Sequence, residues 1–340
     1  MSGLVFKGGH LPIKPIQALN RRVVRCILFD LGDTLWTRGD VKNWERLENS
    51  ANQRAVALLR KHVASQLLAD LDDLELGFRL REAFNTYVRT NIRSNPEIEP
   101  KGPSAALETL LQWGIGDIDI AFGAAIFEAL RVRIPESRPL FEDTLSTLAA
   151  LQERGFRLGI VSNRIWGGQP FQEDLRTLGL HKYFDLQSIA VSGDLGVRKP
   201  SPSIFLHALN ALKIAPEDTV MVGDSLSADI VGAQRLGIFA TWKPKRIVRE
   251  RIHNRLLTTR PSSTHAYSPQ QAPAEAGMQS EMLLTDAPLP GMHITDDDFV
   301  LAQVQSRDYL DKYLSGEIMP DLIIEHCGEL LDVFSKVGVQ

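Results

Sequence analysis

Short apolar runs and helical repeats divide the chain into regions of different character. Residues 23–29 are rich in β-branched and large apolar side chains, which predicts a buried strand ending at Asp30. From about 43 to 130 the apolar positions instead recur every three or four residues, which predicts several helices and no strand. Asn95-Pro96 and 101–103 (Lys-Gly-Pro) interrupt this region and mark breaks between helices.

From residue 140 onward, strand-like and helix-like segments alternate. The predicted strands lie near 157–161, 186–191, 219–222 and 239–242, and the predicted helices over about 140–154, 171–178, 202–212 and 227–236. This alternation with short loops predicts an α/β fold with a doubly wound parallel sheet. In such sheets reactive groups lie at the carboxyl ends of strands, where Asp30, Ser162 and Asp224 all fall.

The last hundred residues follow a different pattern. The basic run 243–251 suggests a solvated helix start more than an anion site, and 257–292 is rich in Ser, Thr, Pro, Gln and Ala, which is typical of a mobile loop. We expect this loop to be dispensable for chemistry. Further along, a helix over 297–314, a short strand at 322–324 and a last helix over 328–334 are predicted.

Composition restricts the setting and the partners. The 340 residues exceed one minimal domain, and 44% hydrophobic with 24% charged residues is ordinary for a globular protein. A net charge of -4 builds no broad cationic surface, so neither nucleic acid nor an anionic membrane is expected as a partner. Two cysteines are too few for a disulfide framework, and no long apolar segment is present, which favours a reduced, cytoplasmic setting.

Three polar residues, two at strand ends and one in a loop, suit phosphoryl chemistry. A carboxylate such as Asp30 can act as a nucleophile, although an Asp after a strand is more often a turn residue or a helix cap. Ser162 could hold a phosphate oxygen or cap the next helix. Lys199 could neutralise charge on a transferring group, or be an ordinary solvated loop residue.

Asp224 and Asp229 add a pair of carboxylates across a strand-to-helix turn. Magnesium favours oxygen ligands, usually one or two carboxylates together with water and a substrate phosphate. The alternative is that both acids only favour the positive end of the following helix. In isolation, neither the pair nor any of the preceding residues identifies a function.

The order of these segments is more informative than any one of them. FDLGDTL at 29–35, VSN at 161–163, RKP at 198–200 and GDSLSAD at 223–229 resemble the four motifs of the haloacid dehalogenase-like hydrolase superfamily. The resemblance implies a Rossmann-like core with a helical cap, and Mg²⁺ as cofactor. It implies these roles: Asp30 as nucleophile; Ser162 and Lys199 as catalytic phosphate-binding residues; Thr34 and Asn163 as substrate contacts; and Asp30, the Gly32 carbonyl, Asp224 and Asp229 as metal ligands.

The same resemblance implies a domain organisation. We expect a lead-in at 1–22, a core made of 23–36 and 139–242, a helical cap at 37–138, an insert at 243–319 and a last strand and helix of the core at 320–340. A cap that closes over the site would exclude water and select substrate. Arg38, Arg79, Arg89, Arg131 and Arg133 could contact an anionic substrate, but arginines on helices are more often solvated surface residues, so none is singled out. Trp166 could line the pocket mouth or be a packed loop aromatic.

One position departs from the family pattern. Most phosphatases of the superfamily carry a second Asp two places after the nucleophile, and here that place is Gly32, with Asp33 one step further. General acid–base help is worth roughly 10²–10⁴-fold, so its loss predicts a slow enzyme or another proton donor. Asp33 can substitute only if the turn directs it inward.

The function predicted from these residues is a magnesium-dependent phosphatase acting on a small phosphorylated metabolite through an aspartyl-phosphate on Asp30. Two alternatives are a metal-independent haloacid dehalogenase, which would resemble a pattern with an aromatic residue in place of Gly32, and a non-catalytic binding protein that retains the fold. The residues do not choose among phosphorylated substrates, and they leave the oligomeric state open.

Overall fold

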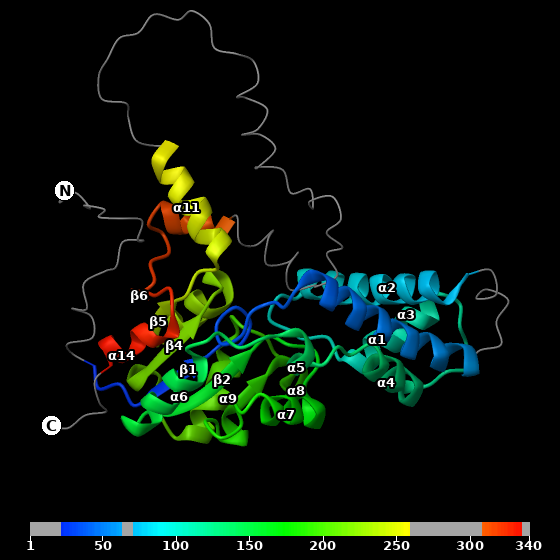
Figure 1. Cartoon of the computed structure of the whole chain (residues 1–340), viewed down its shortest axis with the longest axis horizontal. Coiled ribbons are helices and arrows are strands. Elements are labelled where there is room, and N and C mark those ends of the chain that lie inside the picture. The colour runs from blue at the N-terminus through cyan, green and yellow to red at the C-terminus, as the bar shows by residue number, and fades with distance from the viewer. Residues whose placement is uncertain (1–21, 63–70, 259–307, 335–340) are drawn as a thin grey trace, which may run out of the picture.

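The computed structural model describes residues 22–62, 71–258 and 308–334. A parallel sheet covered by helices forms the larger part, and a group of long helices extends from one end of it (Figure 1). None of the helices within these residues is both long enough and apolar enough to cross a membrane.

Six parallel strands form the sheet in the order β3-β2-β1-β4-β5-β6. Their bounds are β1 (Cys26–Phe29), β2 (Arg157–Ser162), β3 (Ile189–Val191), β4 (Thr219–Gly223), β5 (Phe239–Trp242) and β6 (Leu322–Ile323). In the register of the three central strands, Phe29 lies opposite Ile160 and Val222. The carboxyl ends of these strands therefore reach the same edge of the sheet, which is where the predicted site residues follow them.

Both faces of the sheet are buried, as the apolar character of the strands requires. Ile27 and Phe29 point into one core layer, and Cys26 and Leu28 point into the other. The first layer receives side chains from α6 (Thr144–Glu153), α7 (Gly168–Thr177) and α14 (Leu330–Val333). The second receives them from α9 (Pro202–Leu212), α10 (Val231–Gln234), α11 (Arg246–Thr258) and the helical residues 308–314. Helices on both faces confirm the predicted doubly wound α/β fold.

Four of the five helices between β1 and α6 in the sequence pack around a core of their own. They are α1 (Val41–His62), α2 (Asp73–Ser94), α3 (Gly102–Gln112) and α4 (Ile120–Ala129), and we call residues 41–129 the cap. Asp72 and Asp119 cap α2 and α4, because their carboxylates accept the backbone N–H of Glu75 and Phe122. A pair of aromatic residues, Phe84 and Phe127, lies within the cap core.

Two short connections join the cap to the sheet, and we call residues 36–39 and 137–140 together the hinge. They run antiparallel to each other, with Trp36 bridged to Leu140. The backbone N–H of Thr37 donates to Pro139, and that of Gly39 donates to Ser137, both at 3.0 Å. The second connection begins at Ser137, the last residue of the short helix α5 (Ile134–Ser137).

Several elements differ from their predicted extent. The segment 227–236 begins as a π-helix, η5 (Leu226–Ile230), before α10, and the first half of 186–191 is a single 3-10 turn, η3 (Leu186–Ser188). The remaining short elements are α8 (Ser192–Leu195), η4 (Pro216–Asp218) and η6 (Cys327–Glu329). The predicted loop at 257–292, apart from its first two residues, the lead-in up to 21 and the first part of 297–314 lie outside the described residues.

Candidate active site

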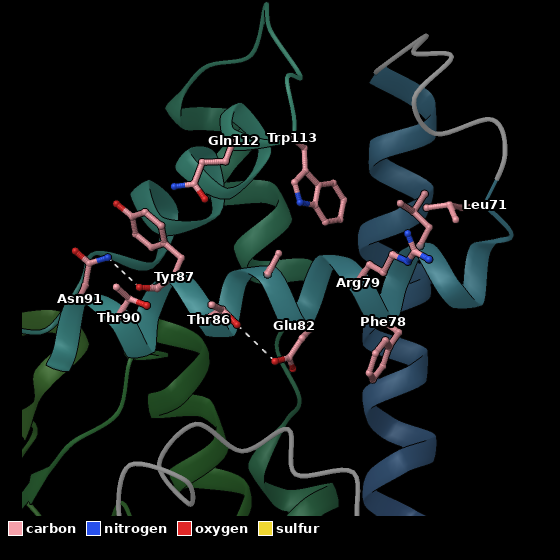
Figure 2. Close-up of a pocket in the computed structure, with 12 residues that line it drawn as sticks. Leu71, Phe78, Arg79, Glu82, Thr86, Tyr87, Thr90, Asn91, Gln112 and Trp113 are labelled. Carbon is pink, nitrogen blue, oxygen red and sulfur yellow. Dashed lines mark hydrogen bonds between the residues drawn. The ribbon is translucent and has the colours of Figure 1, made fainter. Parts of the chain in front are cut away.

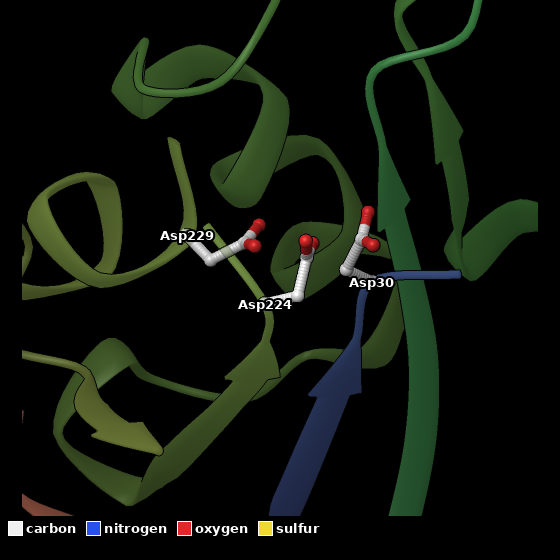
Figure 3. Close-up of side chains that lie close together, drawn as sticks. All are labelled: Asp30, Asp224 and Asp229. Atoms are coloured by element: carbon white, nitrogen blue, oxygen red, sulfur yellow. The ribbon is translucent and has the colours of Figure 1, made fainter. Parts of the chain in front are cut away.

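Three carboxylates converge at the carboxyl edge of the sheet. Asp30 follows β1, Asp224 follows β4 and Asp229 lies in η5, and each offers an oxygen within 4.8 Å of the others (Figure 3). Backbone bonds hold this geometry, because the N–H of Asp30 donates to Val222 and the N–H of Ser225 donates to Asp229 Oδ2 at 2.9 Å. The structure thus brings together the three acids that the family resemblance assigns to a metal.

The approach of Asp229 to the strand end requires a glycine at residue 223. A Cβ atom at Gly223 would lie 2.3 Å from Cγ of Asp229, well inside van der Waals contact. The absence of a side chain at this position is therefore what allows the π-helix to bring its carboxylate against β4.

Lys199 lies between two of these acids. Its buried ammonium donates to Asp30 Oδ1 at 2.6 Å and to the carbonyl of Val161 at 2.7 Å, and it lies 2.6 Å from Asp229 Oδ1. The side-chain amide of Asn163 holds the backbone of the lysine from both sides, accepting from its N–H at 2.7 Å and donating to its carbonyl at 3.0 Å. Asn163 also lines the cleft, and these two bonds give it a positioning role toward Lys199.

Burial dominates the electrostatics of the cluster. It raises the pKa of Asp30 to about 6, although the Lys199 ammonium opposes the shift, and it raises the pKa of Asp224 to about 6 against the opposing charge of Lys245. Burial alone would lower the pKa of Lys199, but the carboxylates of Asp229 and Asp30 outweigh it and raise that pKa. Crowded carboxylates with raised pKa values are a donor set that a hard divalent cation would relieve.

A cleft of about 310 Å³ opens over this cluster. Its lining includes Ser162 at the end of β2, together with Gly32, Asp33 and Asn163. Thr34 does not take part, since it is fully buried under the turn and is not among the lining residues. The expected contact between Thr34 and substrate is therefore contradicted by its position, because the turn after β1 carries it into the interior.

Asp33 faces the cleft from a left-handed backbone conformation, with φ of 53°. Its Oδ2 lies 2.7 Å from Nζ of Lys245, and the same ammonium lies 3.1 Å from Asp224 Oδ2. Lys243 donates to the backbone carbonyl of Asp33 at 3.0 Å and lies over the ring of Phe141. The expectation of a solvated helix start at 243–251 is therefore wrong for both lysines, although it holds for exposed Arg246, where α11 begins.

A segment of the cap reaches the loop that carries Lys199. We call residues 95–101, between α2 and α3, the strap. Ile98 forms a bridge with Val197, and further backbone bonds join Glu97 to Arg198 and Glu99 to Gly196. The buried carboxylate of Glu99 accepts from Arg198 at 2.6 Å.

The same carboxylate also accepts from the hydroxyl of Ser192 at 2.5 Å. That hydroxyl in turn accepts the backbone N–H of Arg164, directly after Asn163, at 2.7 Å. One cap residue, Glu99, thus connects the loop of the core that carries Lys199 with the loop that follows Ser162.

The arginines that line the cleft are mostly not the five candidates named from the sequence. Of the five predicted candidates only Arg38 lines the cleft. The others pair with acids: Arg79 with Glu75, Arg89 with Glu82, Arg131 with Glu128 and Arg133 with Asp174. Arg138 and Arg164 line the cleft and were not among the candidates, while Trp166 is a packed aromatic, stacked on Phe127 at 5.2 Å between ring centroids.

A larger hollow of about 820 Å³ lies on the cap itself, lined mainly by α2 and the end of α3 (Figure 2). Its polar side chains include Glu82 and Thr86, whose hydroxyl donates to the Glu82 carboxylate at 3.5 Å. Arg79, one of the candidate contacts for an anionic substrate, lines this hollow and pairs with Glu75, but none of the predicted catalytic or metal-ligating residues lines it. We therefore assign the chemistry to the cleft over Asp30.

The site has an aspartate after the first strand of a parallel sheet, a buried lysine beside that aspartate and two further acids after β4. These features define a class of hydrolases with a carboxylate nucleophile. Comparison with known families agrees, since the model for haloacid dehalogenase-like hydrolases matches residues 24–237. The chain belongs to this family, and the prediction of a phosphatase-type hydrolase is confirmed at this level.

Several characterised proteins are similar to the chain. It is 30% identical over 224 residues to a glyceraldehyde 3-phosphate phosphatase of Methanopyrus kandleri, covering 64% of this chain and 82% of that protein. It is 36% identical over 104 residues to a phosphoserine phosphatase of Thermus thermophilus, covering 31% of this chain and 40% of the other. A crystal structure of a phosphatase from Thermococcus onnurineus is 25% identical with a TM-score of 0.44, covering 66% of this chain and 87% of that one.

Proposed function

We propose that the protein is a magnesium-dependent phosphatase that removes the phosphoryl group of a small phosphorylated metabolite through an aspartyl-phosphate on Asp30. The observation that carries the proposal is the position of the Lys199 ammonium, 2.6 Å from both Asp30 and Asp229 at the floor of a cleft. The relatives named for glyceraldehyde 3-phosphate and phosphoserine support a small phosphorylated substrate.

In the first step a carboxylate oxygen of Asp30 attacks phosphorus, and the ester P–O bond breaks with its electron pair on the leaving oxygen. Lys199 binds Oδ1 of Asp30, which limits rotation of the carboxylate and leaves Oδ2 as the attacking atom. Ser162, which lines the same cleft, would donate a hydrogen bond to a phosphoryl oxygen. Water then attacks the phosphoryl group, releasing phosphate and restoring the carboxylate.

The residues at the floor of the cleft fit a magnesium ion. Asp30, Asp224 and Asp229 present carboxylate oxygens within 4.8 Å of one another, and all three are oxygen donors of the kind magnesium prefers. They would hold the ion together with the carbonyl of Gly32. When bound, magnesium supplies positive charge that offsets the repulsion between an anionic nucleophile and an anionic phosphate.

We assign proton transfer to Asp33. Among the described acids that line the cleft it is the one outside the three-carboxylate cluster, and two lysines fix its turn. A carboxyl group in this position can protonate the leaving oxygen and later take a proton from the attacking water. Asp33 lies one residue later than the usual family position, which predicts less effective proton transfer and therefore slower turnover than in phosphatases with the usual aspartate.

The test is phosphate release from an aryl phosphate and a panel of phosphorylated metabolites, with magnesium and with EDTA. We expect Asp30→Asn to abolish release, because the amide cannot form the acyl phosphate. The matched control is Asp117→Asn, the same change at an exposed cap residue whose left-handed backbone (φ 54°) Asn tolerates. Release that persists in EDTA, or in folded Asp30→Asn protein, would rule out the proposed mechanism.

A further inference from the structure

The short loop between β5 and α11 delivers two lysines to the turn that follows β1. The ammonium of Lys243 donates to the backbone carbonyl of Asp33 at 3.0 Å, and the ammonium of Lys245 lies 2.7 Å from Oδ2 of the same residue. One lysine therefore holds the backbone of Asp33, and the other holds its side chain. Two cations from one loop thus act on a single acid that lies 210 residues before the first of them.

This loop is fixed at both of its ends. The backbone N–H of Lys243 donates to the carbonyl of Gly223 at 2.8 Å, and the indole N–H of buried Trp242 donates to the carbonyl of Asp224 at 2.8 Å. On the other side, the carbonyl of Lys245 accepts the backbone N–H of Arg249, in the first turn of α11, at 3.1 Å. The sheet and a helix therefore set the position of the Lys245 backbone, so its ammonium reaches the cleft from a fixed base.

The ammonium of Lys245 lies between two acids that line the cleft. It is 2.7 Å from Asp33 Oδ2 and 3.1 Å from Asp224 Oδ2, and the Lys245 side chain is 29% exposed. The side chains of Asp33 and Asp224 are 21% and 13% exposed, so water and salt screen these contacts only in part. A carboxylate held by such a charged contact loses much of its freedom to change rotamer.

Asp33 needs such a contact because it leaves the backbone one residue beyond the usual family position. A Cβ atom at Gly32 would lie 4.0 Å from Oδ2 of Asp30, so a side chain at that place would start beside the nucleophile. Asp33 starts instead from a left-handed backbone conformation with φ of 53°. Its side chain has three staggered rotamers about the first torsion, and a contact from outside the turn must select the one that serves the reaction.

We propose that Lys245 is a positioning residue, which holds the Asp33 carboxyl group in the rotamer from which it transfers a proton to the leaving oxygen. By binding Oδ2, the ammonium leaves Oδ1 for this transfer. The proton passes from Oδ1 to the leaving oxygen as the ester P–O bond breaks, and Asp33 regains a proton from the water that attacks the aspartyl-phosphate. Lys245 thereby compensates for the absence of an aspartate at residue 32. This role rests on the proposed phosphatase function and deepens it.

The experiment compares two phosphate monoesters that differ in their need for a proton. The nitrophenolate of 4-nitrophenyl phosphate leaves without one, whereas the alkoxide of an alkyl phosphate does not; the alkyl ester is the one in the metabolite panel that the wild-type protein hydrolyses fastest. The quantity measured is kcat/KM, which reports phosphoryl transfer to Asp30 and not the later attack of water. Lys245→Met should lower kcat/KM about 10- to 100-fold for the alkyl ester and about threefold or less for 4-nitrophenyl phosphate.

The ratio of the two kcat/KM values comes from one preparation, so it is independent of the fraction of folded protein. Assays at pH 8 with saturating magnesium remove any contribution from altered metal affinity. Lys245→Arg retains a cation and should recover most of the ratio. Lys182→Met is the matched control, at an exposed lysine whose ammonium lies 4.9 Å from the ring centroid of Tyr183, and should leave the ratio unchanged. In an Asp33→Asn background, which keeps a residue that tolerates the left-handed conformation, Lys245→Met should have no further effect on the ratio.

Equal losses for both esters in Lys245→Met would show that the lysine serves only the fold or the metal ligand, and would overturn the assignment. A selective loss that persists in the Asp33→Asn background would also overturn it, because Lys245 would then act on the leaving oxygen without Asp33. Wild-type protein that hydrolyses the aryl phosphate but no alkyl ester would overturn it as well, since no proton would be delivered. Failure of the underlying function is distinguishable, because neither ester would then be hydrolysed in a magnesium-dependent way, and the assignment would fall with it.

Discussion

Replacing Glu99 by Gln tests whether the strap stabilises the loop that carries Lys199. The side chains of Glu99 and Arg198 are 1% and 9% exposed, so the change leaves a guanidinium charge buried beside a neutral amide of the same shape. Removing one partner of a buried ion pair costs about 3–5 kcal/mol. The matched control lies two residues away, where Glu97 pairs with Arg235 and both side chains are more than 40% exposed. Glu97→Gln should cost about 1 kcal/mol or less.

Urea unfolding of both variants gives the two free energies, and steady-state kinetics gives the effect on turnover. We expect Glu99→Gln to lower kcat more than it raises KM, because Lys199, which follows Arg198 directly, is the residue proposed to hold the Asp30 nucleophile in place. In an Arg198→Met background the stability cost of Glu99→Gln should shrink, since no buried charge is left uncompensated. Equal costs for Glu99→Gln and Glu97→Gln, or an undiminished cost in that background, would refute the reasoning.

Three further changes test the cluster at the cleft floor. Gly223→Ala should displace Asp229, and so weaken magnesium activation and lower kcat/KM about 100-fold. The control is Gly116→Ala, where a Cβ meets nothing within 4 Å and neither effect is expected. A magnesium titration of activity compares the two variants. Because burial raises the pKa of both Asp224 and Asp30 to about 6, protons compete with magnesium below that pH, so calorimetry should show the affinity falling about fivefold or more as pH decreases from 6 to 5. Affinity independent of pH in this range would contradict the assignment of the ligand. Lys245→Met removes the charge that opposes this shift, so the midpoint should move to higher pH, and an unmoved pH profile would show that the ion pair is unimportant.

The predictable part of this structure depends on local patterns. Apolar runs identified the central strands because parallel strands are buried on both faces, and α9 and β5 fall where the periodicity predicts them. Asp30, Ser162 and Asp224 follow strands, so the common edge of a parallel sheet brings them together once the fold class is known. The strand ends predict that Asp30 and Asp224 meet, and the motif at 223–229 adds Asp229 to them.

The unpredicted part depends on contacts between distant residues. A basic run appears solvated in sequence, and only the turn after β5 shows that Lys243 and Lys245 face Asp33, more than 200 residues earlier. Arg138 was missed because it reaches the cleft through its position opposite Arg38 in the hinge, which no periodicity encodes. Glu99 was missed for the same reason, since a buried acid in a cap loop is recognisable only once its partner in the core is known.

The strap has a mechanical consequence for the cap. A lid joined to its base by a single two-stranded hinge can swing, but here the strap adds a separate attachment through the Ile98–Val197 bridge and the buried Glu99–Arg198 pair. Wide opening would therefore require the strap to detach, exposing two charged groups to water at the same moment. Product release through this movement would require the Glu99–Arg198 ion pair to break. The rate of release would therefore fall steeply as the temperature is lowered.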